Sequence, residues 1–200
     1  QQHMLKVFCR NLIKQKLIST MFKKIFFIIF SFIALESFVV ADILEYEKAT
    51  YEGQTFFGDP HGRGKITFTD GEIYTGQWKF GLRHGRGSAI FSDGSTYVGQ
   101  YSENIINGAG VYTFSNGAKY TGMHKEGLSE GKGRLEYADG RLFEGTFKND
   151  WRYEGILTLN DGTTMEGIFP KDGKADGKYN ITYEDGSKEI WTFKDGEFVE

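Results

Sequence analysis

A period of 23 residues constrains this chain more than any other feature. The segment YTGQWKFGLRHGRGSAIFSDGST (74–96) is followed by YVGQYSENIINGAGVYTFSNGAK (97–119), and Tyr-x-Gly, Gly-x-Gly and Asp/Asn-Gly recur at the same offsets. The letters between these positions change freely. Because self-similarity at a fixed period of this length marks stacked supersecondary units, we expect an array of repeats.

The array is expected to contain six repeats and part of a seventh. The first four repeats have 23 residues each, the fifth loses one residue around 151–155, and the sixth gains one around 175–180. The repeats start at Tyr51, Tyr74, Tyr97, Tyr120, Phe143 and Met165, and Trp191 opens the truncated seventh.

Apolar and polar residues alternate along two segments of each repeat. After Gly-x-Gly, Ile66 and Phe68 fall on one face while Lys65 and Thr67 fall on the other, and the opening segment 74–78 alternates in the same way. A period of two residues predicts strands that are apolar on one face. Each repeat is therefore predicted to be a β-hairpin, and the chain one antiparallel meander.

Asp-Gly or Asn-Gly pairs separate the predicted strands. Asp and Asn tolerate a left-handed backbone and Gly has no Cβ, so these pairs favour tight hairpin turns. The pairs are Asp70-Gly71, Asp93-Gly94, Asn116-Gly117, Asp139-Gly140, Asp161-Gly162 and Asp185-Gly186.

The glycine of Tyr-x-Gly falls inside a predicted strand, where glycine normally costs about 0.5–1 kcal/mol. An aromatic ring that lies over the bare backbone compensates for such a glycine. Tyr97 and Trp78 are rings of the kind that we expect in this role.

About 13 strands at about 4.8 Å spacing give a sheet roughly 60 Å long. Open sheets of this width curl. The predicted fold is all-β: an elongated, curved single-layer antiparallel meander of hairpins, preceded by a hydrophobic signal-like helix. Residues 42–50 and 191–200 are expected to cap the ends of the array as half-repeats, as such arrays require.

The combination of Tyr-x-Gly-x-Trp, Gly-x-x-His-Gly-x-Gly and Asp-Gly resembles the MORN repeat. The best matches are residues 74–94 and 120–140, and the resemblance extends over Tyr51–Gly186. It implies a meander of hairpins that serves as a scaffold or binding surface. In relatives, such repeats accompany lipid kinase or lysine methyltransferase domains or tether membranes at junctions; none of that chemistry is carried over to this chain.

Two repeats depart from the family pattern. The fifth lacks the first glycine of Gly-x-Gly, and the sixth keeps only Asp176-Gly177 at that place. The hairpin geometry of these two repeats is therefore a point for the structure to decide.

Residues 21–41 have the layout of a secretory signal peptide. Lys23 and Lys24 precede the apolar run 25–35, and small residues end at Ala41, after which we expect cleavage. The run is shorter than the roughly 20 apolar residues that span a bilayer. The expected location is therefore exported, either periplasmic or secreted, with an uncleaved membrane anchor over 25–41 as the alternative.

Residues 1–20 precede Met21, which makes a better translation start than Met4. This extension contains basic residues and no acidic ones, so organelle targeting is a second interpretation of it. Cys9 is the only cysteine and lies here, which leaves residues 42–200, the predicted repeat domain, without a disulfide or thiolate metal site.

The charge of the repeat domain disfavours two classes of partner. The chain has 24 basic and 27 acidic residues; removing the 6 and 1 found in residues 1–41 leaves 18 and 26, a net charge of −8. Nucleic acids and anionic lipid headgroups both require Lys/Arg surfaces. We expect no nucleic-acid partner, and membrane contact only through the N-terminal apolar segment.

The polar residues of the repeats are interpreted as turn residues. His61 and His84 are separated by two strands, about 9.5 Å, which is too far for one zinc ion. The Asp residues of the turns have the same separation, and Gly85-Arg86-Gly87 precedes a strand rather than the helix that a phosphate loop requires. We expect no catalytic residue, metal, cofactor or small-molecule substrate.

One face of the predicted sheet is aromatic, and a single layer has no second layer to cover it. Contiguous apolar patches of more than a few hundred Å² usually mark binding sites. We therefore predict a non-catalytic module that binds a protein, or a second copy of itself, through its concave aromatic face or its edges. The alternatives are a membrane tether held by 25–41 and a hydrolase-like activity at a site that the sequence does not reveal. The candidate binding face consists of Tyr74, Trp78, Tyr97, Tyr101, Tyr120, Phe143 and Phe147.

Overall fold

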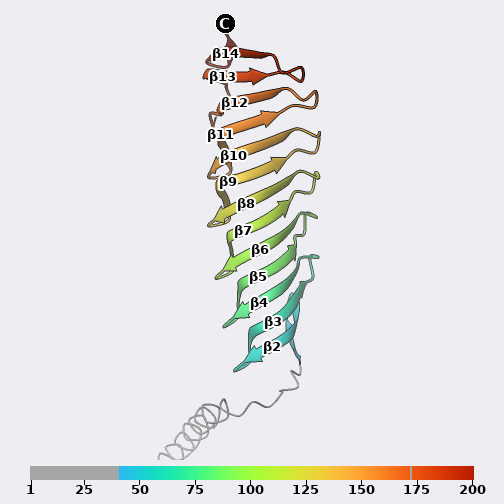
Figure 1. Ribbon diagram of the computed structural model, residues 1–200. Coiled ribbons are helices and arrows are strands. Elements are labelled where there is room, and N and C mark those ends of the chain that lie inside the picture. Colours follow the sequence, from blue (N-terminus) through green and yellow to red (C-terminus); the bar gives the residue numbers. More distant parts are fainter. Residues whose placement is uncertain (1–40, 172) are drawn as a thin grey trace, which may run out of the picture. The chain divides into compact units, whose positions relative to one another are not determined.

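The computed structural model forms one antiparallel sheet whose strands follow one another in chain order (Figure 1). It describes residues 41–171 and 173–200. The strands are β1 (Asp42–Tyr46), β2 (Ala49–Phe56), β3 (Asp59–Phe68), β4 (Ile73–Lys79), β5 (Leu82–Ile90), β6 (Thr96–Ser102), β7 (Ile105–Thr113), β8 (Lys119–Lys125), β9 (Leu128–Glu136), β10 (Leu142–Lys148), β11 (Trp151–Thr158), β12 (Thr164–Ile168), β13 (Gly177–Thr182), β14 (Lys188–Lys194) and β15 (Glu197–Phe198).

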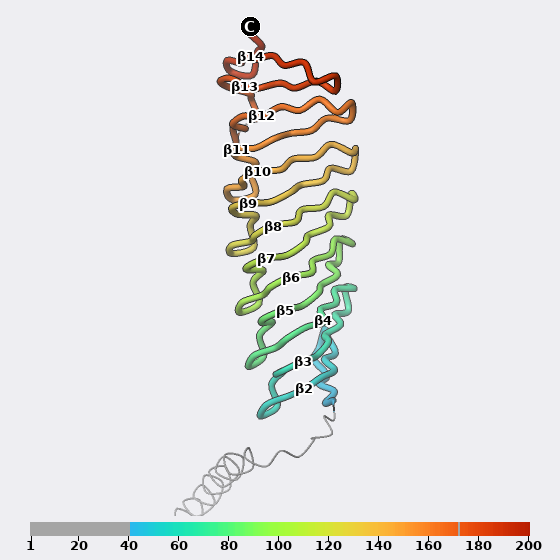
Figure 2. Tube along the Cα trace, viewed as in Figure 1, coloured from blue at the N-terminus to red at the C-terminus, as the bar shows by residue number. Residues whose placement is uncertain are grey.

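The predicted all-β, single-layer meander is confirmed for the described residues. The sheet is open and contains 15 strands, more than the 13 or so expected, because short strands form at 42–46 and 197–198 as well. The trace in Figure 2 shows the hairpins stacked along one axis in sequence order. The predicted N-terminal helix and the extension 1–20 lie outside the described residues.

Two kinds of turn alternate along the sheet. At the predicted Asp-Gly turns, Asp93 Oδ1 accepts a hydrogen bond from the backbone N–H of Ser95 at 2.9 Å, and Gly94 has φ of 84°. At the other end of the hairpins, both turn residues have positive φ, as in Phe80 (50°) and Gly81 (79°). This second turn is of the mirror-image kind that matches the twist of paired strands, and the sequence analysis did not predict it.

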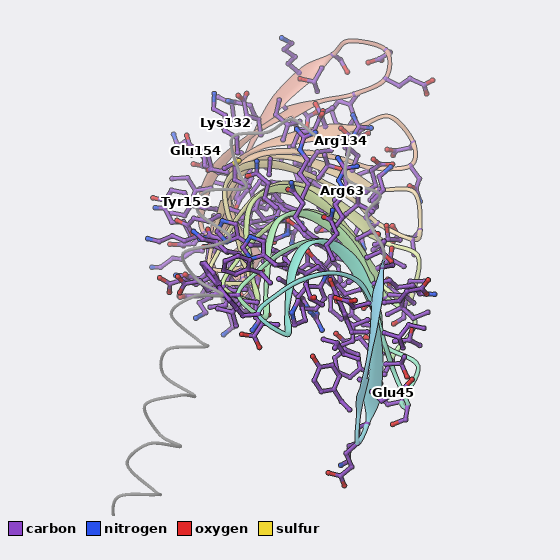
Figure 3. The ribbon with its side chains drawn as sticks, turned by 90° about the horizontal axis from the view of Figure 1, so that it is seen from below. Glu45, Arg63, Lys132, Arg134, Tyr153 and Glu154 are labelled. Atoms are coloured by element: carbon purple, nitrogen blue, oxygen red, sulfur yellow. The ribbon has the colours of Figure 1, made fainter. Side chains whose placement is uncertain are left out.

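A bulge bends each of the first four hairpins near the middle of its strands. In β4 and β5, Gly76 pairs with Gly87 but the next pair is Trp78 with Arg83, so Gln77 alone faces three residues. Gln77 Oε1 accepts the backbone N–H of Arg86 at 2.7 Å. Bulges bend the strand that contains them, and Figure 3 shows the strands as arcs when the sheet is seen along its stacking direction.

The bend brings the two ends of a strand toward each other on one face. Glu72 precedes β4 and Arg83 follows it, yet the carboxylate and guanidinium are 2.5 Å apart. The Arg83 guanidinium also lies 5.1 Å from the centroid of the Tyr74 ring. This face is therefore concave, and Tyr74 is completely buried in a sheet of one layer.

The repeated tyrosine lies over a pair of strand glycines. A Cβ atom at Gly87 would come within 2.5 Å of Tyr74 Oη, and one at Gly76 would come equally close. Tyr74 Oη donates a hydrogen bond to the carbonyl of Gln77 at 2.9 Å. The same cross-strand contact recurs under Tyr51, Tyr97 and Tyr120.

The predicted ring cover is thus confirmed for Tyr97, but Trp78 has another role. Its indole Nε1–H donates to the carbonyl of Gly64 at 3.1 Å. Its ring meets Tyr51 and Tyr74 edge-on, with centroids 5.3 and 5.2 Å away. Trp78 therefore joins the rings of adjacent repeats rather than covering a glycine.

The fifth repeat absorbs its missing residue in the bulge. Thr146 pairs with Glu154 and Phe147 with Arg152, so only Tyr153 is extra. Phe143 still covers a glycine pair, since a Cβ at Gly145 would lie 2.8 Å from its ring tip. The hairpin survives because the ring and the glycines are both retained.

The sixth repeat exchanges the ring and a glycine between neighbouring strands. Met165 stands at the tyrosine position of β12, and Tyr179 stands on β13 where earlier repeats have glycine. A Cβ at Gly167 would meet the Tyr179 ring at 2.6 Å, and Tyr179 Oη donates to the carbonyl of Ile168. The contact is therefore preserved with the ring supplied from the other strand.

We predict that Gly87→Ala strongly destabilises the sheet. Its backbone is not left-handed, so the effect is purely the collision of the new methyl group with the Tyr74 ring. Overpacking of this kind costs roughly 1–3 kcal/mol, measurable as a loss in the free energy of unfolding in urea.

The matched control is Thr75→Ala, an exposed position on the opposite face of β4. It should leave the unfolding midpoint nearly unchanged. A Gly87→Ala protein as stable as the Thr75→Ala protein would contradict the proposed contact.

Candidate binding surfaces

The seven residues predicted as a binding face lie in the sheet's own core. All are buried, with exposed fractions between 0% (Tyr74, Tyr97 and Phe143) and 6% (Trp78). A partner would reach these rings only if the two ends of each bent hairpin moved apart.

Buried and half-buried rings form one continuous ladder along the concave face. Neighbouring centroids lie 4.8 to 5.5 Å apart and neighbouring ring planes meet at 71° to 90°, the edge-to-face arrangement that aromatic rings favour. In order, the ladder contains Tyr51, Trp78, Tyr74, Tyr101, Tyr97, His124, Tyr120, Phe147, Phe143, Phe169, Tyr179 and Phe193.

The phenols of the ladder are held in their neutral form. Burial raises the pKa of Tyr51, Tyr74 and Tyr120 to about 12 in each case, and it raises the pKa of Tyr101 further. Desolvation has this effect because it disfavours the phenolate. These groups are therefore suited to packing and to hydrogen bonding with backbone carbonyls.

His124 occupies the ladder position that Trp78, Tyr101 and Phe147 hold in the other repeats. Its ring is 5% exposed and lies edge-on to Tyr97 and Tyr120, with centroids 5.2 and 5.1 Å away. Burial lowers its pKa, with smaller opposing effects from the Gly108 carbonyl and from Asp150.

Among the described residues, His124 Nδ1 has no hydrogen-bond partner, and the same holds for the Tyr101 hydroxyl. A protonated imidazole would carry an unpaired Nδ1–H into this apolar ladder. The 23-residue period places His124 at the same repeat position as Trp78.

The Asp candidates of the sequence analysis are turn residues, whereas His61 and His84, which were also expected to be turn residues, lie within strands β3 and β5. His61 Nδ1 accepts the backbone N–H of Phe80 at 3.4 Å, and its ring packs on Phe80. Oδ1 of Asp70, Asp139 and Asp185 accepts the backbone N–H two residues ahead. Over the residues that the structure describes, no three His, Cys, Asp or Glu side chains are grouped for a metal ion.

Exposed apolar side chains lie along the side of the sheet that carries the positive-φ turns. Phe57 and Phe80 are 64% and 58% exposed. The first residue after successive turns is also exposed and apolar: Leu82, Ile105, Leu128 and Trp151. The sequence analysis missed this row, although its members recur at the repeat period.

The described sheet has a free edge at each end. At one end, β1 pairs only with β2. At the other end, β15 covers only Phe193 and Lys194 of β14, and the terminal residues hydrogen-bond to Thr192. Lys188–Trp191 therefore pair with β13 on one side and have an open backbone on the other.

Comparison with family models gives a match to the MORN repeat at residues 51–73, 74–96, 97–119 and 120–140. Residues 51–140 therefore match four tandem MORN repeats. Each match begins at a tyrosine that covers a glycine pair, so the predicted resemblance is confirmed for these repeats. The fifth and sixth repeats continue the same sheet outside the matched residues.

A search of curated proteins gives no match. Among solved structures, the chain is similar to the TCP domain of SAS-4 (dCPAP) from Drosophila melanogaster, solved in complex with a proline-rich motif of Ana2 (dSTIL). The identity is 12%, the match covers 79% of this chain and 94% of that one, and the TM-score is 0.37.

We predict that acid destabilises the MORN sheet through His124. The folded pKa is lowered, so as pH falls below the unfolded value of about 6.5 the unfolded chain takes up a proton that the folded chain resists. The stability that neutral His124 contributes is therefore complete above about pH 6.5 and declines below it.

Replacement of His124 by Phe, the residue at position 147, should make stability fall less steeply between pH 7.5 and 5, measured by urea unfolding at each pH. Tyr101→Phe is the control, because it removes the other unpaired polar atom of the ladder without removing an imidazole. Equal acid sensitivity in His124→Phe and in the unaltered chain would contradict the prediction.

Proposed function

We propose that this chain is a non-catalytic, exported scaffold that binds protein chains by adding strands to the free edges of its MORN sheet. The observation that carries the proposal is the open backbone of β1 at one end and of Lys188–Trp191 at the other. Unpaired N–H and C=O groups in a row are a template for an added strand.

The side chains next to the two free edges are apolar, which favours the binding of an added strand. Ile43 on β1 and Ile190 on β14 are 66% and 59% exposed. An added strand would give each isoleucine a cross-strand neighbour, and apolar cross-strand pairs supply affinity beyond the backbone hydrogen bonds.

The aromatic ladder supports this function by stabilising the sheet whose edges would bind the partner. It fixes the register of the strands and leaves the edges as the accessible backbone. Direct contact with Trp78 or Tyr101 is the less favoured route, because a partner would first have to displace Arg83 from its position over Tyr74.

Export is proposed from the signal-like residues 21–41. The first strand begins at Asp42, so cleavage after Ala41 would leave every strand intact. The alternative is a tether that keeps residues 25–41 as an anchor. Within the described part of the chain, no helix has the length and apolar character needed to cross a membrane.

Mass spectrometry of the protein purified from its own cells tests export and cleavage. We expect the mature chain to begin at Asp42, with the sheet unaltered. A protein that retains residues 25–41 and fractionates with membranes would favour the tether and contradict cleavage.

Differential capture tests binding at the edges. The immobilised chain should retain specific proteins, and Ile43→Lys or Ile190→Lys should retain less of them, because each replaces the apolar side chain beside a free edge. Val98→Lys is the matched control: Val98 is 60% exposed in mid-sheet, at the repeat position of Ile190. Equal retention by all three variants would contradict binding at the edges.

A further inference from the structure

The two free edges are complementary parts of one repeat. In β1, Leu44 pairs with Tyr51, as Ile66 of β3 pairs with Tyr74, so β1 is a strand of the Gly-x-Gly type. In β14, Phe193 pairs with Gly177, as Trp78 of β4 pairs with Gly62. β14 is therefore a strand of the tyrosine type, and Glu189 stands at its tyrosine position, not Trp191, which was expected to open the seventh repeat.

Inside the sheet, each tyrosine-type strand is followed by a Gly-x-Gly strand. The two strands pair in two segments, one on each side of the bulge. On β4, residues 82–83 cover the part beside the turn, and residues 87–90 cover the rest across the bulge. On β14, β15 supplies only the first part. The part left open, Lys188–Trp191, is the one that residues equivalent to 87–90 would cover.

Residues 42–45 of β1 are those equivalents, since β1 pairs with β2 as residues 64–67 of β3 pair with β4. We propose that β1 of one copy pairs with β14 of another copy and completes the repeat. The register is Lys188 with Glu45, Glu189 with Leu44, Ile190 with Ile43, and Trp191 with Asp42. This inference rests on the proposed function and names a second copy of the chain as the partner.

The proposed register pairs Lys188 with Glu45, and an equivalent Lys–Glu pair already exists inside the sheet. Lys119 of β8 and Glu136 of β9 occupy the positions of Lys188 and Glu45, and their side chains are 3.2 Å apart. Opposite charges directly across an antiparallel pair stabilise it. The join would therefore repeat an ion pair that the protein uses between its own repeats.

The apolar pair also has a precedent. Val98 of β6 faces Val111 of β7 at the positions that Ile190 and Ile43 would take. Both isoleucines are more than half exposed in the single chain, and pairing would make them cross-strand neighbours, as Val98 and Val111 are inside the sheet. The neighbouring carboxylate of Glu189 already accepts hydrogen bonds from Tyr183 Oη and Trp191 Nε1.

The join uses different surfaces on its two partners. Each copy that joins through β1 keeps its own β14 edge open, and the reverse also holds. Heterologous contacts of this kind give open-ended series rather than a closed dimer. The expected product is a concentration-dependent series of linear oligomers in which the sheet continues from copy to copy.

A mixing experiment with the full chain tests this asymmetry. Ile43→Lys and Ile190→Lys each remove one side of the apolar pair, so each variant alone should associate more weakly than the unaltered chain. A mixture of the two should recover association and favour 1:1 dimers, because one unaltered β14 edge and one unaltered β1 edge remain. Sedimentation in a non-denaturing detergent measures this, and residues 1–40 are common to every sample.

The controls separate this join from other contacts. Val98→Lys changes the equivalent face in mid-sheet and should associate like the unaltered chain. A monomeric unaltered chain at all concentrations, a closed dimer, or equal loss of association in Val98→Lys would each overturn the join. Capture of a different protein at the same edges would then still support the proposed function, so the two can fail independently.

Charge reversal tests the register. Glu45→Lys places a like charge opposite Lys188 and should weaken association about fivefold, as expected for one cross-strand pair. Combining Glu45→Lys with Lys188→Glu restores the opposite charges and should recover the original affinity. Failure of the double variant to recover would overturn the register.

Discussion

The contact between an aromatic ring and a pair of strand glycines determines the form of this sheet. Glycine weakens a strand when nothing covers it, but here the absence of a Cβ lets the Tyr74 ring lie on the backbone of two strands. The hydroxyl then reaches the Gln77 carbonyl, and the bulge that begins there bends the hairpin. One contact therefore buries a large side chain, ties two strands together and sets the curvature.

The same contact decides where the protein can interact. A flat single layer would leave its aromatic face exposed, whereas the bent hairpin encloses the ladder beneath pairs such as Arg83 and Glu72. The rings of the concave face pack against one another and are not available to a partner. Backbone hydrogen-bonding groups remain free only where a described strand lacks a neighbour, and this shifts the expected binding from the rings to the edges.

The sequence predicted the strands, the Asp-Gly turns and the ring over glycine because each depends on residues close together in one repeat. It did not predict the enclosure of Trp78 or Tyr101, because that depends on the approach of residues 11 positions apart, Glu72 and Arg83, across a bulge. The exchange at Tyr179 was missed for a related reason. The pattern was read strand by strand, while the physical requirement is one ring for each glycine pair, supplied by either strand.

This requirement also explains how the proposed join differs from the pairings inside the sheet. At the join, Glu189 stands at the tyrosine position, and Trp191 and Asp42 stand where an internal pair has two glycines. No ring can therefore lock the two strands as Tyr74 locks β4 to β5. Only backbone hydrogen bonds, one ion pair and one apolar pair remain to hold the copies together, so the join must be weaker than the pairing of β4 with β5. Copies would associate and separate while each sheet stays folded.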